Sequence, residues 1–175
     1  MSTSTSNFHF LADEWPRLFE SATRVEALAH SDPRAACFHA RWALEQAVQW
    51  LYRADGSLRS PYQDHLNALL HEPTFRTLVG PIVFAKAKMV KDLGNLAVHS
   101  HKKIAAENAV TAARELFHVL FWVARRYARR STPSDALRFD AGLLAPAAAT
   151  AAPQSPDQLR RLEETLRERD GKLAA

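Results

Sequence analysis

The chain has 175 residues, 47% of them hydrophobic and 24% charged, and a formal net charge of +4. These values predict one globular domain with a buried core and exclude a disordered chain, while so slight a basic excess does not by itself indicate a nucleic-acid partner. No apolar run reaches the roughly 18 residues that a membrane span needs, and the single cysteine, Cys37, cannot form an intrachain disulfide, so we expect a cytoplasmic protein.

The first third of the chain predicts a short tail and two long helices. Residues 1–7 are rich in Ser and Thr and lack the basic-then-apolar layout of a signal peptide. Apolar residues recur at helical spacing over 15–30, with a proline early, where a missing N–H costs nothing. Asp32 is a predicted N-cap and Pro33 a first-turn proline of a second helix that continues to about Ala54. Its many alanines indicate a close approach to a neighbouring helix.

Two further helices are predicted in the middle of the chain. Leucines over 66–70 indicate a short helix before Pro73. The Gly80-Pro81 pair is expected to open another helix, which should end at Gly94. The inward residues of that helix are predicted to be Ile82, Ala85, Met89 and Leu93.

The second half begins with the longest predicted helix, Ile104–Arg130, followed by an Ala/Pro-rich linker over 131–156. Three linker side chains are expected to pack back onto the helices: Phe139, Leu143 and Leu144. Residues 157–175 resume as a charged helix with heptad-like Leu159, Leu162, Leu166 and Leu173. Together the elements predict an all-α fold, an antiparallel four- to five-helix bundle over 1–130 with a C-terminal linker and a short extra helix. Because the last helix lacks a closing cap, its pattern is typical of a chain that continues into a longer polypeptide.

The most informative stretch is Lys91-Asp92-Leu93-Gly94-Asn95-Leu96-Ala97-Val98-His99-Ser100-His101. Glycine lets a backbone leave a helix with positive φ, asparagine bridges nearby backbone groups, and histidine ionises near neutrality. One interpretation is structural, a helix C-cap at Gly94 with Asn95 and His99 tying down the next helix. A second is a polar site for phosphate or proton transfer, and a third is a contact surface for a partner.

The segment resembles the GN-x-x-VH motif of a bacterial helical-domain family grouped with the HEPN superfamily, a set of α-helical domains that includes RNases. Its best-known carriers are the motor (R, or HsdR) subunits of type I restriction–modification enzymes, where the domain lies at the N-terminus. Lys91, Gly94, Asn95 and His99 are the family-motif residues here. The resemblance covers essentially the whole chain through further motifs in the same order: Asn7-Phe8-His9-Phe10-Leu11, Trp15-Pro16, Asp32-Pro33, Arg41, Leu44-Glu45 and Gln158-Leu159.

The resemblance does not supply an active site. The RNase members carry an Arg and a His separated by four to six residues, the Arg stabilising phosphate charge and the His acting in acid–base chemistry. Counting back from His99, the positions that qualify hold Asp92, Leu93 and Gly94, and Lys91 stands one residue too far out. His99 is therefore the only catalytic candidate, and we expect no catalytic activity from this chain alone.

Other candidate sites are weaker. Four arginines near the end of the longest helix complement its C-terminal dipole, or with two lysines form a phosphate-binding edge. These residues are Arg125, Arg126, Arg129, Arg130, Lys102 and Lys103. The His99-x-His101 pair lacks further metal ligands, and the chain has no P-loop, so we expect neither a metal nor a cofactor. Cys37 is expected to be a small buried residue. Three tryptophans are expected to be core or interface anchors: Trp42, Trp50 and Trp122.

Three functional hypotheses follow. The resemblance implies a non-catalytic interaction domain that docks a restriction R subunit onto partner subunits, or onto the rest of a longer polypeptide, with weak, non-specific contact to DNA backbone. The first alternative is a HEPN-type RNase or toxin-like protein that acts as a dimer through His99. The second is a structural helical adaptor of another multidomain protein. None of the three involves a membrane.

Overall fold

The computed structural model describes residues 5–147 and 152–174, and every regular element in these ranges is a helix. The all-α prediction is confirmed. The elements are η1 (His9–Leu11), α1 (Pro16–Leu28), α2 (Pro33–Ala54), α3 (Leu66–His71), α4 (Pro73–His99), α5 (Ala106–Tyr127), η2 (Ala141–Leu143) and α6 (Pro156–Ala174). No helix of the described residues is long and apolar enough to cross a membrane.

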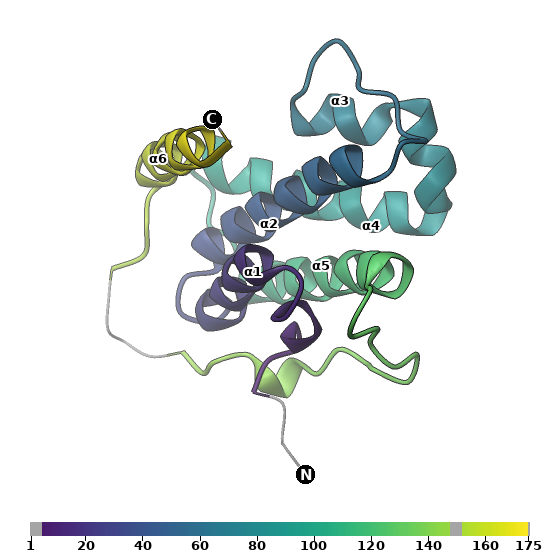
Figure 1. Cartoon of the computed structure of the whole chain (residues 1–175). Helices are drawn as coiled ribbons and strands as arrows, with labels where there is room; N and C mark the ends of the chain where they lie inside the picture. The colour runs from purple at the N-terminus through teal and green to yellow at the C-terminus, as the bar shows by residue number, and fades with distance from the viewer. Residues whose placement is uncertain (1–4, 148–151, 175) are drawn as a thin grey trace.

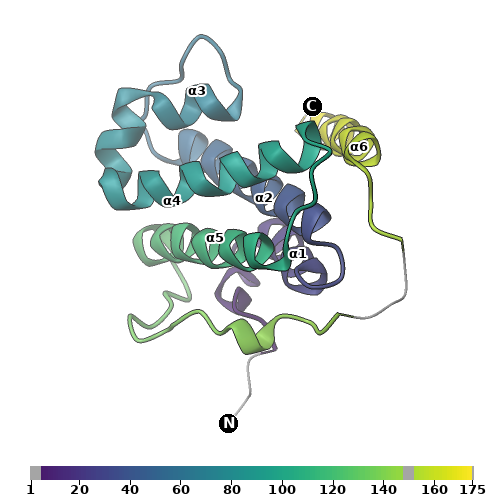
Figure 2. The same ribbon diagram turned by 180° about the vertical axis from the view of Figure 1, so that it is seen from behind.

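The α2 helix is the centre of the bundle, with α1, α4 and α5 packed around it (Figures 1 and 2). Its alanines let these neighbours approach closely, because a small side chain keeps helix axes near each other. The fully buried alanines of α2 are Ala35, Ala36, Ala40 and Ala43. α3 covers one end of α4, and α6 lies against α4 near its C-terminal end.

The start of α2 follows the predicted cap. The Asp32 carboxylate accepts a hydrogen bond from the backbone N–H of Ala35 at 3.1 Å, and Pro33 occupies the first turn. The other oxygen of the same carboxylate accepts from the backbone N–H of Gln154 at 2.9 Å. One N-cap residue therefore also fixes the segment that leads into α6.

The α4 helix departs from the sequence prediction at both ends. It begins at Pro73 and is kinked rather than opened at Gly80, whose φ of 79° and ψ of 169° are accessible to glycine. It also runs through Gly94 to His99. Because the chain is kinked and not interrupted at Gly80, residues 73–79 belong to the same helix. Residues 95–99 remain helical because side chains of α2 and α6 bond to them, as described below.

The inward face of α4 was predicted wrongly for three of its four residues: Leu93 is partly buried against the core, but Ala85, like Ile82 and Met89, is exposed. Ile82 is 72% exposed and Met89 46% exposed, whereas the small or branched residues on the opposite face are buried: Ala87, Val90, Ala97 and Val98. Both faces of this helix carry apolar residues, so periodicity alone did not determine which one packs. The face with the smaller side chains lies against α2 and α5 because it permits the closer approach.

The α5 helix ends at Tyr127, three residues before the predicted Arg130. The Glu14 carboxylate accepts hydrogen bonds from the backbone N–H groups of Arg129 and Arg130 at 2.9 and 2.5 Å. The backbone N–H groups that would have continued α5 therefore bond to the Glu14 side chain, just before α1. These bonds end α5 beside the N-terminal segment.

Part of the predicted N-terminal tail is core. Ser6 and Asn7 are buried, and both donate to the carboxylate of Glu26, which is only 5% exposed. Asn7 also exchanges two hydrogen bonds with the backbone of Asp140, at 3.0 and 2.7 Å. The tail prediction is therefore wrong for these two residues, because Glu26 offers them a buried acceptor. Residues 1–4 lie outside the described ranges.

The described segment after α5, residues 128–147, crosses the outside of the bundle (Figure 1). As predicted, apolar side chains of this segment pack back onto the helices: Leu144 is buried, Leu143 is half-buried, and the Phe139 ring lies 5.8 Å from that of Phe117. Within α6, Leu159 is buried and Leu162 and Leu166 are half-buried, while the side chain of Leu173 lies outside the described part.

Candidate functional site

Gly94 lies inside α4, and its missing side chain lets α4 touch α2. Its backbone is helical, since Gly80 is the only described residue with positive φ. A Cβ at position 94 would stand 2.8 Å from Arg41 Cδ and 2.9 Å from Arg41 Cγ, and closer still to Arg41 Cβ. These separations are well below the 3.5–4.0 Å of an ordinary carbon contact. The expected C-cap with positive φ is therefore wrong, and helix packing is what requires glycine here.

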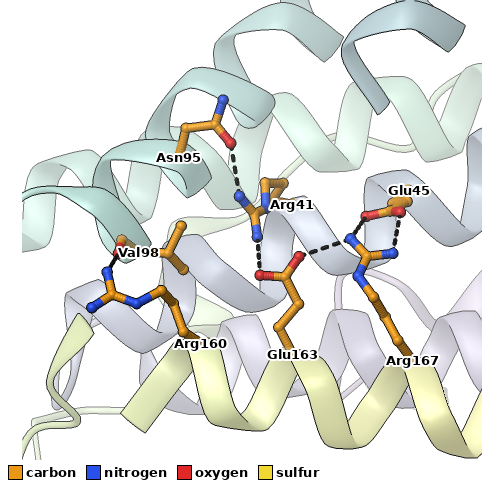
Figure 3. A network of polar contacts seen from close by, with 7 residues as sticks. All are labelled: Arg41, Glu45, Asn95, Val98, Arg160, Glu163 and Arg167. Carbon is orange, nitrogen blue, oxygen red and sulfur yellow. Dashed lines mark hydrogen bonds and ion pairs between the residues drawn. The ribbon is translucent and has the colours of Figure 1, made fainter. Parts of the chain in front are cut away.

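The Arg41 side chain joins three helices (Figure 3). Its guanidinium donates to Asn95 Oδ1 on α4 at 2.7 Å and to Glu163 Oε2 on α6 at 2.9 Å. The side chain is only 9% exposed, so these bonds satisfy a charge that is nearly removed from water. The structural interpretation expected Asn95 to tie down the next helix. Asn95 instead binds a side chain of α2, so that expectation is wrong.

A second set of charged contacts continues from Glu163 (Figure 3). Arg167 donates to both carboxylate oxygens of Glu45, at 2.8 and 3.1 Å, and to Glu163 Oε1 at 2.7 Å. The Glu45 side chain is 5% exposed. The pKa of the Arg167 guanidinium is raised, mainly by its hydrogen bonds to Glu45. The same guanidinium lies 5.4 Å from the centre of the Trp42 ring. The charged residues of α6 are therefore matched to those of α2.

Two arginines satisfy the carbonyl groups at the C-terminal end of α4. Arg160 of α6 donates to the backbone oxygen of Val98 at 2.6 Å. Arg34 of α2 donates to three more, those of Ala97, Ser100 and Lys102, at 2.7, 2.6 and 2.5 Å. Positive charge at this end also complements the helix dipole. These contacts explain why α4 continues past Gly94.

His99 is the last residue of α4 and is exposed. Its ring makes no hydrogen bond or ion pair with any described residue. The expected tie to the next helix is therefore wrong, because Arg34 and Arg160 take that role. His101, in the following loop, is exposed as well.

Lys91 does not approach His99. Its Nζ donates to Asn67 Oδ1 at 2.8 Å and lies 3.3 Å from Asp92 Oδ1, and the residue is only 8% exposed. Eight residues along a helix correspond to about 12 Å of axial rise. The Lys91 side chain is thus turned toward α3, and the basic groups at the end of α4 are Arg34 and Arg160, which donate to backbone carbonyls on both sides of His99 and not to its ring.

The six predicted phosphate-binding residues lie at opposite ends of α5. Lys102 and Lys103 precede this helix of 22 residues and the arginines follow or end it, so the two groups are roughly 33 Å apart. The arginines are also engaged individually. Arg125 donates to the carbonyl of Pro133 at 2.8 Å, and Arg126 lies 5.7 Å from the Trp122 ring. Asp13 lies 3.6 Å from Arg130. The structure therefore does not bring the six residues together as one basic edge.

Cys37 and the tryptophans lie where the helical pattern predicted. Cys37 is fully buried, and burial raises the pKa of its thiol to about 12, so the thiolate form is suppressed. Trp42 is 5% exposed. Trp50 is partly buried, and its ring lies 5.4 Å from that of Trp15. Trp122 is also partly buried against the core.

His39 of α2 is a buried titratable residue that sequence reasoning did not single out. It is 5% exposed, and burial, assisted by the charge of Arg24, lowers its pKa to about 4. A helical wheel would have indicated it, since it is three residues from Ala36 and four from Ala43 on the buried stripe. No described residue donates to or accepts from its ring, so its effect is on stability.

We expect the stability of the fold to decrease as pH falls from 6.5 to 4. In this window the unfolded chain protonates His39 and the folded chain does not, so unfolding takes up a proton. The contribution is at most about 1.4 kcal/mol per pH unit. Urea unfolding of wild type and His39→Phe between pH 5 and 6.5 tests this, with a shallower slope expected for the variant. Equal slopes would contradict it, since the pH dependence would then come from other groups with a lowered pKa, such as His118 and the carboxyls of Glu14 and Glu72.

The described residues contain no group of three His, Cys, Asp or Glu side chains arranged to hold a metal ion. No curated protein and no solved structure matches the chain. A family model described as "Domain of unknown function (DUF4145)" matches residues 23–166, from within α1 to within α6. Because this match spans most of the chain and includes Arg41, Gly94 and Glu163, the protein belongs to the DUF4145 family.

Proposed function

We propose that this chain is a non-catalytic helical interaction domain that docks the R subunit of a type I restriction–modification enzyme onto its partner subunits or onto DNA backbone. The parent is suggested by the resemblance of the Lys91–His99 segment to the N-terminal domain of such subunits. The non-catalytic part is supported by the engagement of Lys91 and Asn95 with other side chains, and by that of Arg34 and Arg160 with backbone carbonyls on both sides of His99.

The observation that carries the docking role is the inverted pattern of α4. This helix turns its polar residues Lys91 and Asn95 toward neighbouring helices and leaves three large apolar side chains exposed: Ile82, Met89 and Leu96. The three are spaced seven residues, or about 10.5 Å, apart on one face of the helix, and exposed Ala85 and half-buried Leu93 lie between them and complete the stripe. Exposed apolar residues in a contiguous row are typical of a surface that contacts another protein.

The proposal is tested by mixing the full chain with the methyltransferase–specificity core of a type I system and measuring association by analytical ultracentrifugation. A complex is expected, and Ile82→Glu with Met89→Glu should weaken it at least tenfold, because charge would be buried without a partner. Tyr62→Glu is the matched control, since Tyr62 is fully exposed and outside the stripe. Absence of a complex at tens of micromolar, or equal loss in the control, would contradict the proposal.

Contact with DNA backbone is tested separately with duplex DNA of random sequence. The affinity is expected to be weak and to fall with added salt, because the basic residues are divided between the two ends of α5. Fluorescence anisotropy at two salt concentrations measures it. Tight binding that does not respond to salt would contradict a backbone contact.

A further inference from the structure

We infer that the face which α2 and α4 present to α6 is a helix-binding site, filled in this structure by the chain's own α6, and that it accepts an amphipathic helix of the same pattern from a partner protein. This face, named here the α6-binding face, comprises Arg41, Glu45, Asn95 and the carbonyl of Val98 (Figure 3). Trp42, whose ring lies 5.4 Å from the Arg167 guanidinium, also belongs to it. The inference rests on the docking role proposed above and adds to the stripe of Ile82, Met89 and Leu96 a second surface, with its occupant.

Two ion pairs determine the direction and register of the occupant. Arg41 and Glu45 stand one turn apart on α2, and they pair with Glu163 and Arg167, one turn apart on α6. The two helices therefore run parallel along these contacts. A helix bound in the reverse direction would place Arg167 against Arg41 and Glu163 against Glu45, and like charges in a buried contact are strongly unfavourable. The face thus selects a Glu followed four residues later by an Arg.

Apolar and end contacts complete the pattern. Leu159 is buried one turn before Glu163, and Leu162 and Leu166 are half-buried beside the charged pair. Arg160 reaches the carbonyl of Val98 at 2.6 Å, which anchors the start of the occupant at the C-terminal end of α4. The occupant recognised is therefore an amphipathic helix with leucines on one face, bordered by the Glu and the Arg.

The α6 helix is suited to be displaced. Among its described side chains only Pro156 and Leu159 are buried, so few apolar contacts hold it. Most of the stability of a helix in a protein comes from packing of its apolar face, so a helix with few buried side chains is weakly held. Its tether is fixed by backbone N–H bonds of Ala145 to Glu26 and of Gln154 to Asp32. A partner helix therefore competes, as a free ligand, with the tethered α6 for the same contacts.

The α6-binding face also holds a donor that α6 does not use. Trp42 is 5% exposed, and its Nε1 is the one buried side-chain nitrogen or oxygen of the described residues without a hydrogen-bond partner. The ring lies against the guanidinium of Arg167. A buried donor without an acceptor is unfavourable, so Trp42 is a residue of this face whose hydrogen bonding α6 leaves incomplete.

The test uses the full chain and a fluorescent peptide of residues 155–172 as the free helix. In the opened chain, Glu163→Arg and Arg167→Glu reverse both charges of α6 and leave the α6-binding face unchanged. We expect this chain to bind the peptide at least tenfold more tightly than wild type, in which α6 competes at an effective concentration on the order of millimolar. A peptide with the same two reversals should not bind the opened chain.

The matched control chain carries Arg161→Glu and Glu164→Arg, which reverse two exposed charges of α6 without changing its net charge. It should bind the peptide no better than wild type. Equal binding of the peptide to the opened and control chains, or binding that ignores the charge reversal, would overturn the inference. A concentration-dependent dimer of wild type that the reversals abolish would also overturn it, because a second copy would then be the occupant.

Hydrogen exchange of wild type gives a second readout that needs no variant. The amides of α6 should exchange through local opening, faster than those of α2. Exchange of both helices at the same slow rate would show that α6 never leaves and would overturn the inference even if the opened chain failed to fold. Peptide binding that fails while restriction subunits still bind the chain would remove this site and leave the proposed function standing.

Discussion

Replacing Gly94 with alanine is expected to lower the free energy of unfolding by about 2–3 kcal/mol, although alanine is the better helix former. The new methyl group would meet Arg41 Cδ at 2.8 Å, Cγ at 2.9 Å and Cβ, the side-chain atom next to the α2 backbone, at still shorter range. The Cβ of Arg41 cannot rotate away, so α2 and α4 must separate. Urea unfolding followed by circular dichroism measures the change.

Gly171→Ala is the matched control for this substitution. Gly171 also lies within a helix, α6, but a Cβ there meets no atom within 4 Å. The control should be neutral or more stable by up to about 1 kcal/mol, since only helix propensity acts. If Gly94→Ala were as stable as Gly171→Ala, the close approach of α2 and α4 at Arg41 would be incorrect.

Arg41→Ala is expected to cost about 3 kcal/mol, the second large effect. Its removal leaves Asn95 Oδ1 without its donor, takes one partner from Glu163 and opens space against Gly94. Because Arg41 connects α2 with α6, the amides of α6 should also lose hydrogen-exchange protection. Urea unfolding and hydrogen exchange of the same variant measure the two effects.

Arg24→Ala provides the comparison for an exposed arginine. Arg24 pairs with Glu20 at 3.3 Å, but both side chains are more than half exposed, so removing the pair should change stability by less than about 0.5 kcal/mol. Similar losses for Arg24→Ala and Arg41→Ala would contradict the central position of Arg41. An Arg41→Ala protein with unchanged exchange in α6 would contradict its link to that helix.

The features of the fold that could be predicted from the sequence are those that depend on residues close together in the chain. Asp32 and Pro33 start α2 by a cap that depends on neighbours within three residues, and the linker after α5 follows from its composition. The inward face of α4 could not be derived in this way, because Met89 and Ala97 belong to two competing apolar faces. Which face packs depends on helices that are distant in sequence.

The candidate site was located in the sequence but its role was not. The sequence marked Gly94 and Asn95 as residues of a motif. Their partner Arg41, however, is on another helix, 54 residues from Asn95. Glu26 carried a signal that was missed: it follows Ala22 by four residues on the buried stripe of α1, where a charged residue implies a buried partner. The pairing of Arg41 with Glu163 has no local signal at all.

Cleavage of RNA by the full chain tests the central claim most directly, that the Lys91–His99 segment holds helices together and does not form an active site. The substrate is a labelled RNA with single- and double-stranded parts, incubated with wild type and with His99→Ala. No cleavage above buffer is expected from either protein, and their free energies of unfolding should agree within about 0.5 kcal/mol, since His99 is exposed and its ring makes no hydrogen bond with a described residue. Cleavage by wild type that His99→Ala abolishes would contradict that claim.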